Sequence, residues 1–417
     1  MCKDLRHCRE RSHLVDSTRT PQRSASQVVR TGASLFGAPS FVVRYNLYTL
    51  TDASPADVHR LLYLERELRK YELVCKRVQA EKLQAHERSM NRWLKHSRLA
   101  SKILRVAAKA RKKGAAVLFY HSIMEDPAPH ERSLGEIIRS TKTFRQQMEM
   151  LAREYRPVSL DDVSDFARDE KDLPSRAVVV TFDDGYADNL EVAAPILNRL
   201  GIPSVVYVTV DCVERQLIPW PARLRYACLT TKKTQMNAPE GGVWSLRTPE
   251  ERTDSFNRSL EHCARLSGMT QETYVAGVER ELEVDSRDIS KGLMMTWDQM
   301  RQLRKQGHTI GSHTMTHPNI AYVSHGEVET ELGESKRKLE AELDERILHF
   351  AYPGPALRPN WSQTSLQLSR ELGYETATTV EPGVVRAGDD PLRMRRIGPG
   401  TTVEQLRWKL DRAFVGD

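Results

Sequence analysis

The sequence predicts an α/β fold built on a parallel sheet or barrel from residue 114 onward. Short apolar runs alternate with amphipathic segments there, and the apolar runs are continuous, as in strands that are buried on both faces. Strands are expected at 115–120, 177–182, 203–210, 347–352 and 374–380. Helices are expected between them, at 141–154, 189–200, 296–306, 326–346 and 362–372.

The interval 212–292 interrupts this alternation. It holds a polar, Gly-rich turn at 239–242 and helical patterns at 249–267 and 270–283. Because these patterns do not continue the strand–helix rhythm, we expect a helical insertion on one face of the domain.

The chain has 417 residues, and its net charge of +7 is unevenly distributed. Residues 1–113 hold 25 Lys and Arg against 10 Asp and Glu, whereas the rest hold 38 against 46. The first 54 residues show no sustained apolar period and are expected to be poorly ordered. Residues 55–113 contain no Gly, and no Pro after the first position. We expect a basic, mostly helical extension there, followed by a domain over 114–417.

Two parts of this extension suggest partners. An a/d stripe at 61–78 spans about two and a half heptads, which is short for an independent coiled coil. Residues 92–113 form a basic amphipathic stretch that could lie on an anionic membrane surface. The alternative is a solvated Lys/Arg-rich helix, and nucleic acid is the least favoured partner.

Composition excludes several classes of protein. No apolar run reaches the roughly 18 residues of a transmembrane helix, and the N-terminus lacks the apolar segment of a secretory signal. The six cysteines are scattered without a C-x-x-C pair, which indicates neither a disulfide framework nor a cysteine zinc site. We therefore expect a reduced, cytoplasmic protein, with the inner membrane surface as an alternative location.

The first candidate site is the segment TFDDGYADN at 181–189, directly after the strand 177–182. Two adjacent carboxylates, Asp183 and Asp184, repel each other at a buried strand end unless a cation or a proton neutralises them. One could bind a metal while the other acts as a base. The alternative is a turn with a helix cap, since Asp before Gly is common in turns.

The second candidate site is GSHTMTHPN at 311–319. Histidines four apart on one turn, His313 and His317, would present both imidazoles to the same side, as a divalent ion requires. Asp184 could supply a third ligand. The alternative is an exposed helix surface. Nearby, His308 is expected to be structural or exposed.

The third candidate site is the segment 349–355, where a strand ends in a Pro/Gly turn. Free backbone N–H groups at such a turn can stabilise an oxyanion. The alternative is a plain strand-end turn.

Three segments in this order, TFDDGYADN at 181–189, GSHTMTHPN at 311–319 and FAYPG at 350–354, resemble the motifs of the NodB-homology polysaccharide deacetylases, carbohydrate esterase family 4. YHSI at 120–123 and MTWD at 295–298 also look like that family. The resemblance runs from about residue 115 to about residue 410. It implies a distorted (β/α) barrel with the site at the carboxyl ends of the strands.

The resemblance also implies roles for individual residues. Asp183 would be the general base, and three residues would hold a divalent, zinc-like metal: Asp184, His313 and His317. The metal would polarise the acetamide carbonyl and acidify a water, and the backbone N–H of Gly354 would stabilise the oxyanion. We expect Tyr352 and Pro353 to contact the substrate.

This sequence departs from the family's pattern at three points, one of which is Gly354, where the family often has Tyr. The family often has an Arg that pairs with the catalytic base at the position of Ala351. The late Leu-x-His, whose His is the general acid, is missing, because no His follows His349. We expect His121, after the first strand, to serve as the acid, with a buried structural His as the alternative. Arg395 or Arg396 could replace the missing Arg.

We therefore expect a metal-dependent hydrolase that removes N-acetyl or other N-acyl groups from amino sugars of a polysaccharide or glycoconjugate. Zinc is the expected ion, with cobalt, nickel or manganese as alternatives. One rival keeps the fold but acts on a lipid-linked sugar or a small amide. Another is a metal-holding, glycan-binding protein with little turnover.

Overall fold

The computed structural model describes residues 114–239 and 241–415. The predictions made for residues 1–113, including the stripe at 61–78 and the basic stretch at 92–113, lie outside this part of the chain.

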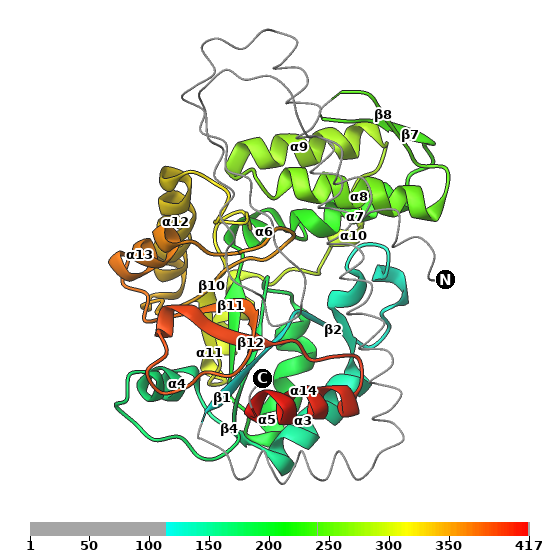
Figure 1. Cartoon of the computed structure of the whole chain (residues 1–417). Helices are drawn as coiled ribbons and strands as arrows, with labels where there is room; N and C mark the ends of the chain where they lie inside the picture. The colour runs from blue at the N-terminus through cyan, green and yellow to red at the C-terminus, as the bar shows by residue number, and fades with distance from the viewer. Residues whose placement is uncertain (1–113, 240, 416–417) are drawn as a thin grey trace, which may run out of the picture. The chain divides into compact units, whose positions relative to one another are not determined.

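A closed ring of seven parallel strands forms the centre of the domain (Figure 1). In order around the ring, these strands are β1 (Ala115–Tyr120), β12 (Met394–Ile397), β11 (Thr376–Pro382), β10 (His349–Ala351), β9 (Thr309–Ser312), β6 (Ser204–Val208) and β5 (Ala177–Phe182), and β5 pairs again with β1. The short β4 (Arg156–Pro157) pairs with the start of β5. The predicted barrel is therefore confirmed.

Side chains alternate between the two faces of the barrel wall. In β1, Val117 belongs to the apolar cluster of the interior, whereas Leu118 belongs to the cluster under the surrounding helices. In β5, Val179 and Val180 divide in the same way. This period of two is what a closed sheet with helices outside requires, and it explains why the strands are apolar throughout.

The five predicted strands all form, although β6 and β10 are shorter than expected and β11 begins and ends two residues later. The structure adds β9 and β12, which the list of predicted strands lacks. β12 reads MRRI, and two consecutive arginines are not the apolar run that a buried strand normally shows.

The helices that follow the strands surround the barrel (Figure 1). They are α3 (Thr141–Glu154), α4 (Leu160–Ala167), α5 (Ala194–Leu200), α6 (Val210–Arg215), α11 (Trp297–Lys305), α12 (His325–Leu343), α13 (Gln363–Glu371) and α14 (Val403–Val415). A π-helical turn over Asn189–Ala193 precedes α5. Capping boxes begin α11 at Thr296 and α12 at Ser324. Gly201, at φ 64°, ends α5 in the left-handed conformation that glycine adopts without strain.

Short elements occupy the connections. They are β2 (Ser122–Met124) paired with β3 (Ile138–Ser140), and the 3-10 turns Ala128–His130, Gly135–Ile137 and Pro391–Arg393.

The interval 212–292 contains a group of helices with its own apolar core (Figure 1, the elements labelled α7 to α10). The group consists of α7 (Trp220–Thr230), α8 (Pro249–Cys263), α9 (Gly268–Glu281) and α10 (Arg287–Ser290), with the hairpin of β7 (Gln235–Asn237) and β8 (Val243–Ser245). Ala356 and Leu357, from the loop after β10, pack against this core. The insertion therefore contacts a loop that leaves the carboxyl end of a barrel strand. The domain boundaries predicted from the sequence stay a prediction.

Within residues 114–239 and 241–415, no helix combines the length and apolar character needed to span a bilayer.

Candidate metal centre and active site

The three sequence segments meet at one end of the barrel. Asp183 and Asp184 follow β5, and the backbone N–H of Asp183 donates to the carbonyl of Tyr120 at the end of β1 (2.9 Å). His313 follows β9, and its N–H donates to the carbonyl of Val208 at the end of β6 (2.8 Å). Parallel strands in register bring these carboxyl ends to one mouth, where (β/α) barrels carry their active sites.

Asp184, His313 and His317 form a buried cluster of metal-ligand atoms, all within 4.8 Å of one another. Nε2 of His317 lies 3.4 Å from Oδ1 of Asp184, and Nε2 of His313 lies 3.7 Å from the same oxygen. Ligand atoms around a tetrahedral zinc ion with bonds of about 2.0–2.1 Å are separated by about 3.4 Å. The spacing of the three groups therefore fits a metal ion of that size.

His313 is oriented by a hydrogen bond at its other nitrogen. Nδ1 lies 2.7 Å from the carbonyl oxygen of Ala351. Because a carbonyl only accepts, Nδ1 carries the proton and Nε2 keeps its lone pair for a ligand bond. Burial also lowers the pKa of His313, which favours the neutral ring that a metal binds.

Two polar atoms of the cluster have no hydrogen-bond partner among the described residues: Oδ1 of Asp184 and Nδ1 of His317. Burial, and then the charge of Asp183, raise the pKa of Asp184 well above its ordinary value. A buried carboxylate oxygen without a donor is costly. A cation beside it would remove that cost, so the orphaned oxygen supports the fit of a metal ion.

The two histidines lie in a loop, so the expected helical turn is wrong. The expected pairing of the two rings is nevertheless present. Thr314 and His317 have φ of 68° and 64°, and Asp184 has φ of 76°. Non-glycine residues in this region cost about 1–3 kcal/mol each and persist where the surroundings hold them. The rings of His313 and His317 still face each other, with centroids 4.9 Å apart.

Arg396, in β12, forms a two-pronged ion pair with Asp183 inside the barrel. Nη1 and Nη2 lie 2.7 and 2.9 Å from the two carboxylate oxygens. Burial alone would raise the pKa of Asp183, but the Arg396 guanidinium, and to a lesser degree His313, hold it well below its ordinary value. Of the two arginines considered from sequence, the structure places Arg396 beside Asp183 and leaves Arg395 exposed.

The guanidinium of Arg396 is fully buried and is satisfied on every side. Its Nε donates to the carbonyl of Thr379 (2.9 Å), and its central carbon lies 4.7 Å from the ring centroid of Phe119. A buried charge survives only with such partners. Arg396 therefore pairs with Asp183, as expected for an arginine that replaces the one missing at Ala351.

His121 lies half-buried near the same mouth. Burial lowers its pKa to about 4, although the charge of Asp183 opposes this effect. Its carbonyl accepts from the side chain of Asn189 (2.8 Å), and the next residue, Ser122, donates to Asp188 (2.6 Å). Because its pKa is lowered, the His121 ring is neutral near pH 7. It can therefore act as a general acid only after it has received a proton.

The turn after β10 begins with Tyr352, a predicted substrate-binding residue. The side chain of Tyr352 is fully buried, and its hydroxyl donates to the carbonyl of Leu392 (3.1 Å). The side chain therefore points into the core, and the expected contact of Tyr352 with substrate stays a prediction. Pro353 is buried and Gly354 is half-buried, and their predicted roles stay predictions.

His308, which was expected to be structural or exposed, bonds residues outside the cluster. His308 is buried, with its ring nitrogens 2.9 Å from Ser204 Oγ and 3.0 Å from Asn198 Oδ1, so it is structural. Two supporting residues escaped the sequence reasoning: Trp220, whose indole N–H donates to the carbonyl of His317 (2.9 Å), and Glu331 of α12. Neither stands in a motif, so no sequence signal marks them.

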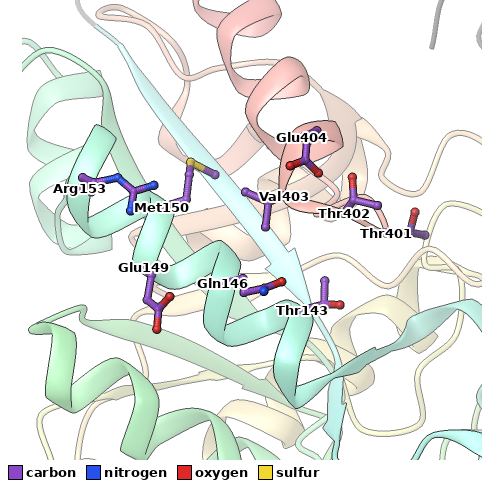
Figure 2. Close-up of a pocket in the computed structure, with 9 residues that line it drawn as sticks. All are labelled: Thr143, Gln146, Glu149, Met150, Arg153, Thr401, Thr402, Val403 and Glu404. Carbon is purple, nitrogen blue, oxygen red and sulfur yellow. The ribbon is translucent and has the colours of Figure 1, made fainter. Parts of the chain in front are cut away.

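A separate groove of 470 Å³ lies between α3 and the start of α14 (Figure 2). Its lining comes from two segments: Thr143, Gln146, Glu149, Met150 and Arg153 from α3, and the four residues 401–404. None of the predicted site residues lines it, so its volume says nothing about the chemistry of the cluster.

Comparison with known proteins agrees with the geometry. Residues 170–377 match the family model described as polysaccharide deacetylase. The chain is 20% identical over 288 residues to "Putative polysaccharide deacetylase YxkH" of Bacillus subtilis, covering 68% of this chain and 71% of that protein. It is 36% identical over 93 residues to the poly-beta-1,6-N-acetyl-D-glucosamine N-deacetylase of Escherichia coli K12, covering 22% of this chain and 13% of that protein.

Among solved structures, the chain is similar to the Streptococcus pyogenes deacetylase PplD in complex with acetate. The TM-score is 0.48 and the identity is 19%, over 72% of this chain and 99% of that one. It is also similar to IcaB from Ammonifex degensii, with a TM-score of 0.47 and 18% identity over 72% and 99% of the two chains.

A polar cluster at the carboxyl ends of a closed parallel barrel is the arrangement of a (β/α)-barrel enzyme. The match over 170–377 gives the family: the chain belongs to the polysaccharide deacetylases, and the resemblance noted in its motifs is confirmed. It is therefore a hydrolase that acts on carbon–nitrogen bonds other than peptide bonds.

Proposed function

We propose that this deacetylase removes N-acetyl groups from the amino sugars of a polysaccharide or glycoconjugate with the help of a divalent metal ion. The observation that carries the proposal is one buried mouth holding the Asp–His–His cluster beside Asp183, which Arg396 keeps ionised. The Escherichia coli relative, named for poly-beta-1,6-N-acetyl-D-glucosamine, supports an N-acetylglucosamine-containing substrate.

The ion would be held by Oδ1 of Asp184 and by Nε2 of His313 and of His317. Two imidazoles and one carboxylate are the ligands of many catalytic zinc sites, and cobalt, nickel or manganese are alternatives. When bound, the ion supplies Lewis-acid polarisation of the acetamide carbonyl and lowers the pKa of a water. The remaining steps are carried by groups of the chain itself.

Asp183 accepts the proton of the water that attacks the acetamide carbon. Arg396 fixes both carboxylate oxygens and thereby keeps Asp183 anionic until the attack. The backbone N–H of Gly354, at the end of β10, donates to the oxygen that becomes negative.

His121 delivers a proton to the leaving nitrogen. The ring is neutral at rest, so it first takes up the proton that Asp183 accepted from the water and then donates it as the carbon–nitrogen bond breaks. The products are acetate and a free amine on the sugar. His121 thus takes the role of general acid, which the family's late histidine would otherwise have.

Acetate release from N-acetylglucosamine oligomers by the purified protein tests this proposal. The reaction is measured after treatment with a chelator and again after zinc or cobalt is restored. The proposal predicts release that stops with the chelator and returns with the metal. Release that is indifferent to both would contradict the role of the ion.

A metal-holding, glycan-binding protein with little turnover is the second candidate. It is favoured by the lack of any histidine after His349. It is opposed by the ion pair between Asp183 and Arg396, since a binding protein needs no base beside the metal. Bound glycan without acetate release, in protein that holds zinc, would favour this candidate.

The location and further partners of the chain are also proposals. We propose that residues 92–113 bind an anionic membrane surface on its cytoplasmic side and bring the enzyme to a lipid-linked sugar. Sedimentation of the protein with anionic vesicles, but not with neutral ones, would support this contact.

A further inference from the structure

One carboxylate from a neighbouring helix helps to hold the segment from His313 to His317. In α12, Oε2 of Glu331 accepts hydrogen bonds from the backbone N–H groups of Met315 (2.9 Å) and Thr316 (2.8 Å). Its Oε1 accepts from the hydroxyl of Thr316 at 2.5 Å. Three donors from two consecutive residues therefore converge on one side chain, between the two predicted metal ligands.

Glu331 is 3% exposed, and none of the Lys or Arg residues described by the structure forms an ion pair with it. A buried carboxylate normally has a cation or several donors beside it. Here the donors come only from the segment that carries the histidines. The same three hydrogen bonds stabilise the charge and help to hold the segment, in which the carbonyls of Thr314 and Met315 also accept from the backbone N–H groups of Val210 and Asp211.

The conformation that Glu331 holds is one that the segment would not adopt alone. Thr314 and His317 both have positive φ, and a β-branched residue there is an outlier. Without the carboxylate, two buried N–H groups would lose their acceptor and the segment would shift to satisfy them. A metal site tolerates such a shift poorly, because its ligand distances are fixed to within about 0.2 Å.

We propose that Glu331 is a positioning residue for the metal centre, which sets the separation of the His313 and His317 rings by anchoring the backbone between them. The inference rests on the proposed function, because it takes the Asp–His–His cluster as the metal site. Glu331 touches neither the substrate nor the ligand side chains, and it acts through the segment.

The helix itself does not depend on this carboxylate. Val328, Leu332 and Leu339 of α12 are buried in the main core, and Ser335 lies 2.7 Å from Ser312 through their hydroxyl oxygens. Removal of the Glu331 side chain should therefore loosen the segment while α12 stays in place. This separation makes the proposal testable.

The experiment measures metal binding by four full-length proteins prepared without metal: wild type, Glu331→Ala, Glu331→Gln and the control Leu339→Ala. Zinc affinity is measured by calorimetry, and the visible absorption of bound cobalt reports the geometry of the ligands. The control removes a buried side chain two turns further along the same helix, so it destabilises α12 without touching the segment.

We expect Glu331→Ala to weaken zinc binding by at least about tenfold, as for other residues that orient ligands, and to change the cobalt spectrum. Glu331→Gln should lose less affinity, since its amide oxygen can still accept from both N–H groups. Leu339→Ala should lower the melting temperature and keep the wild-type affinity and spectrum.

Wild-type affinity and spectrum in Glu331→Ala would overturn the proposal and leave Glu331 a purely structural residue. If Glu331→Ala does not fold, Glu331→Leu decides, because leucine fills most of the space of the side chain but accepts from neither N–H group, and unchanged affinity and spectrum in that variant would overturn the proposal equally. A wild-type protein that binds neither zinc nor cobalt would contradict the proposed metal site itself. The two failures are therefore distinguishable.

Discussion

Arg396 and Asp183 lie on opposite sides of β1, in β12 and directly after β5, and their side chains meet inside the barrel at 2.7 and 2.9 Å. The arginine is separated from the aspartate by more than two hundred positions in the sequence. Closure of the barrel is what brings them together. The pair fixes the orientation of Asp183 and keeps it charged at the mouth of the barrel.

Replacement of Arg396 by Ala should raise the pKa of Asp183, because burial would no longer be opposed by the guanidinium. The acidic limb of the pH–rate profile should move to higher pH, and stability should fall by about 3–5 kcal/mol, as when one partner of a buried ion pair is removed. The check is the pH dependence of acetate release together with urea unfolding. Arg395→Ala, an exposed neighbour, is the matched control. An acidic limb that stays in place would contradict the role of Arg396.

Replacement of His317 by Ala should abolish tight zinc binding and acetate release, because it removes one of three protein ligands. Metal content after dialysis against a weak chelator is the measurement. His308→Ala removes a buried histidine whose ring bonds Ser204 and Asn198, and it should keep its zinc. Equal zinc content in both variants would argue against His317 as a ligand.

The pKa of His121 predicts how this residue contributes to stability as the pH changes. Its folded pKa is about 4, below the ordinary 6.5, so between these values the unfolded chain binds a proton that the native protein does not. The contribution is present above pH 6.5 and is lost as the pH falls toward 4. His121→Asn should therefore lessen the loss of stability over this interval, measured by urea unfolding of the metal-free protein.

Asp188 supplies a control of opposite sign. Burial raises its pKa to about 7, so the native protein holds a proton that the unfolded chain has released between pH 3.8 and 7. Its contribution is present at low pH and is lost as the pH rises toward 7. Asp188→Asn should remove that loss. A change of the same sign in both variants would contradict the assigned pKa shifts.

The hydrogen bond from Trp220 to the carbonyl of His317 links the helical insertion to a proposed metal ligand. Trp220→Phe keeps most of the ring and leaves that buried carbonyl without its donor, which should cost about 1–3 kcal/mol of stability. We also expect a few-fold weaker zinc affinity, by the argument for residues that orient ligands. Thermal unfolding and zinc calorimetry are the measurements. Trp244→Phe, in the same apolar core, should leave zinc affinity unchanged.

Local pattern was sufficient to predict most of the fold. The apolar run of β5 is buried along its whole length, and its β-branched residues suit a strand between two others. β12 escaped because its charged residues resemble a surface segment, whereas Arg396 is buried by an ion pair that only the closed barrel creates. Pattern alone cannot show such a tertiary partner.

The candidate site was likewise predictable only in part from the sequence. The motif segments predicted which residues would cluster, because strand ends in a parallel barrel share one mouth. The left-handed backbone at Thr314, the inward side chain of Tyr352 and the support from Glu331 were not predictable. Each depends on contacts between elements distant in sequence, for which residue spacing carries no information.

The most direct test of the central claim is acetate release by Asp183→Asn with its zinc content measured in the same sample. Asn has nearly the shape of Asp but cannot accept the proton of the attacking water. We predict full zinc content, because Asp184, His313 and His317 are intact, and a loss of turnover of about 10²-fold or more, as for removal of a general base. Wild-type turnover by zinc-loaded Asp183→Asn would contradict the assignment of Asp183 as the base.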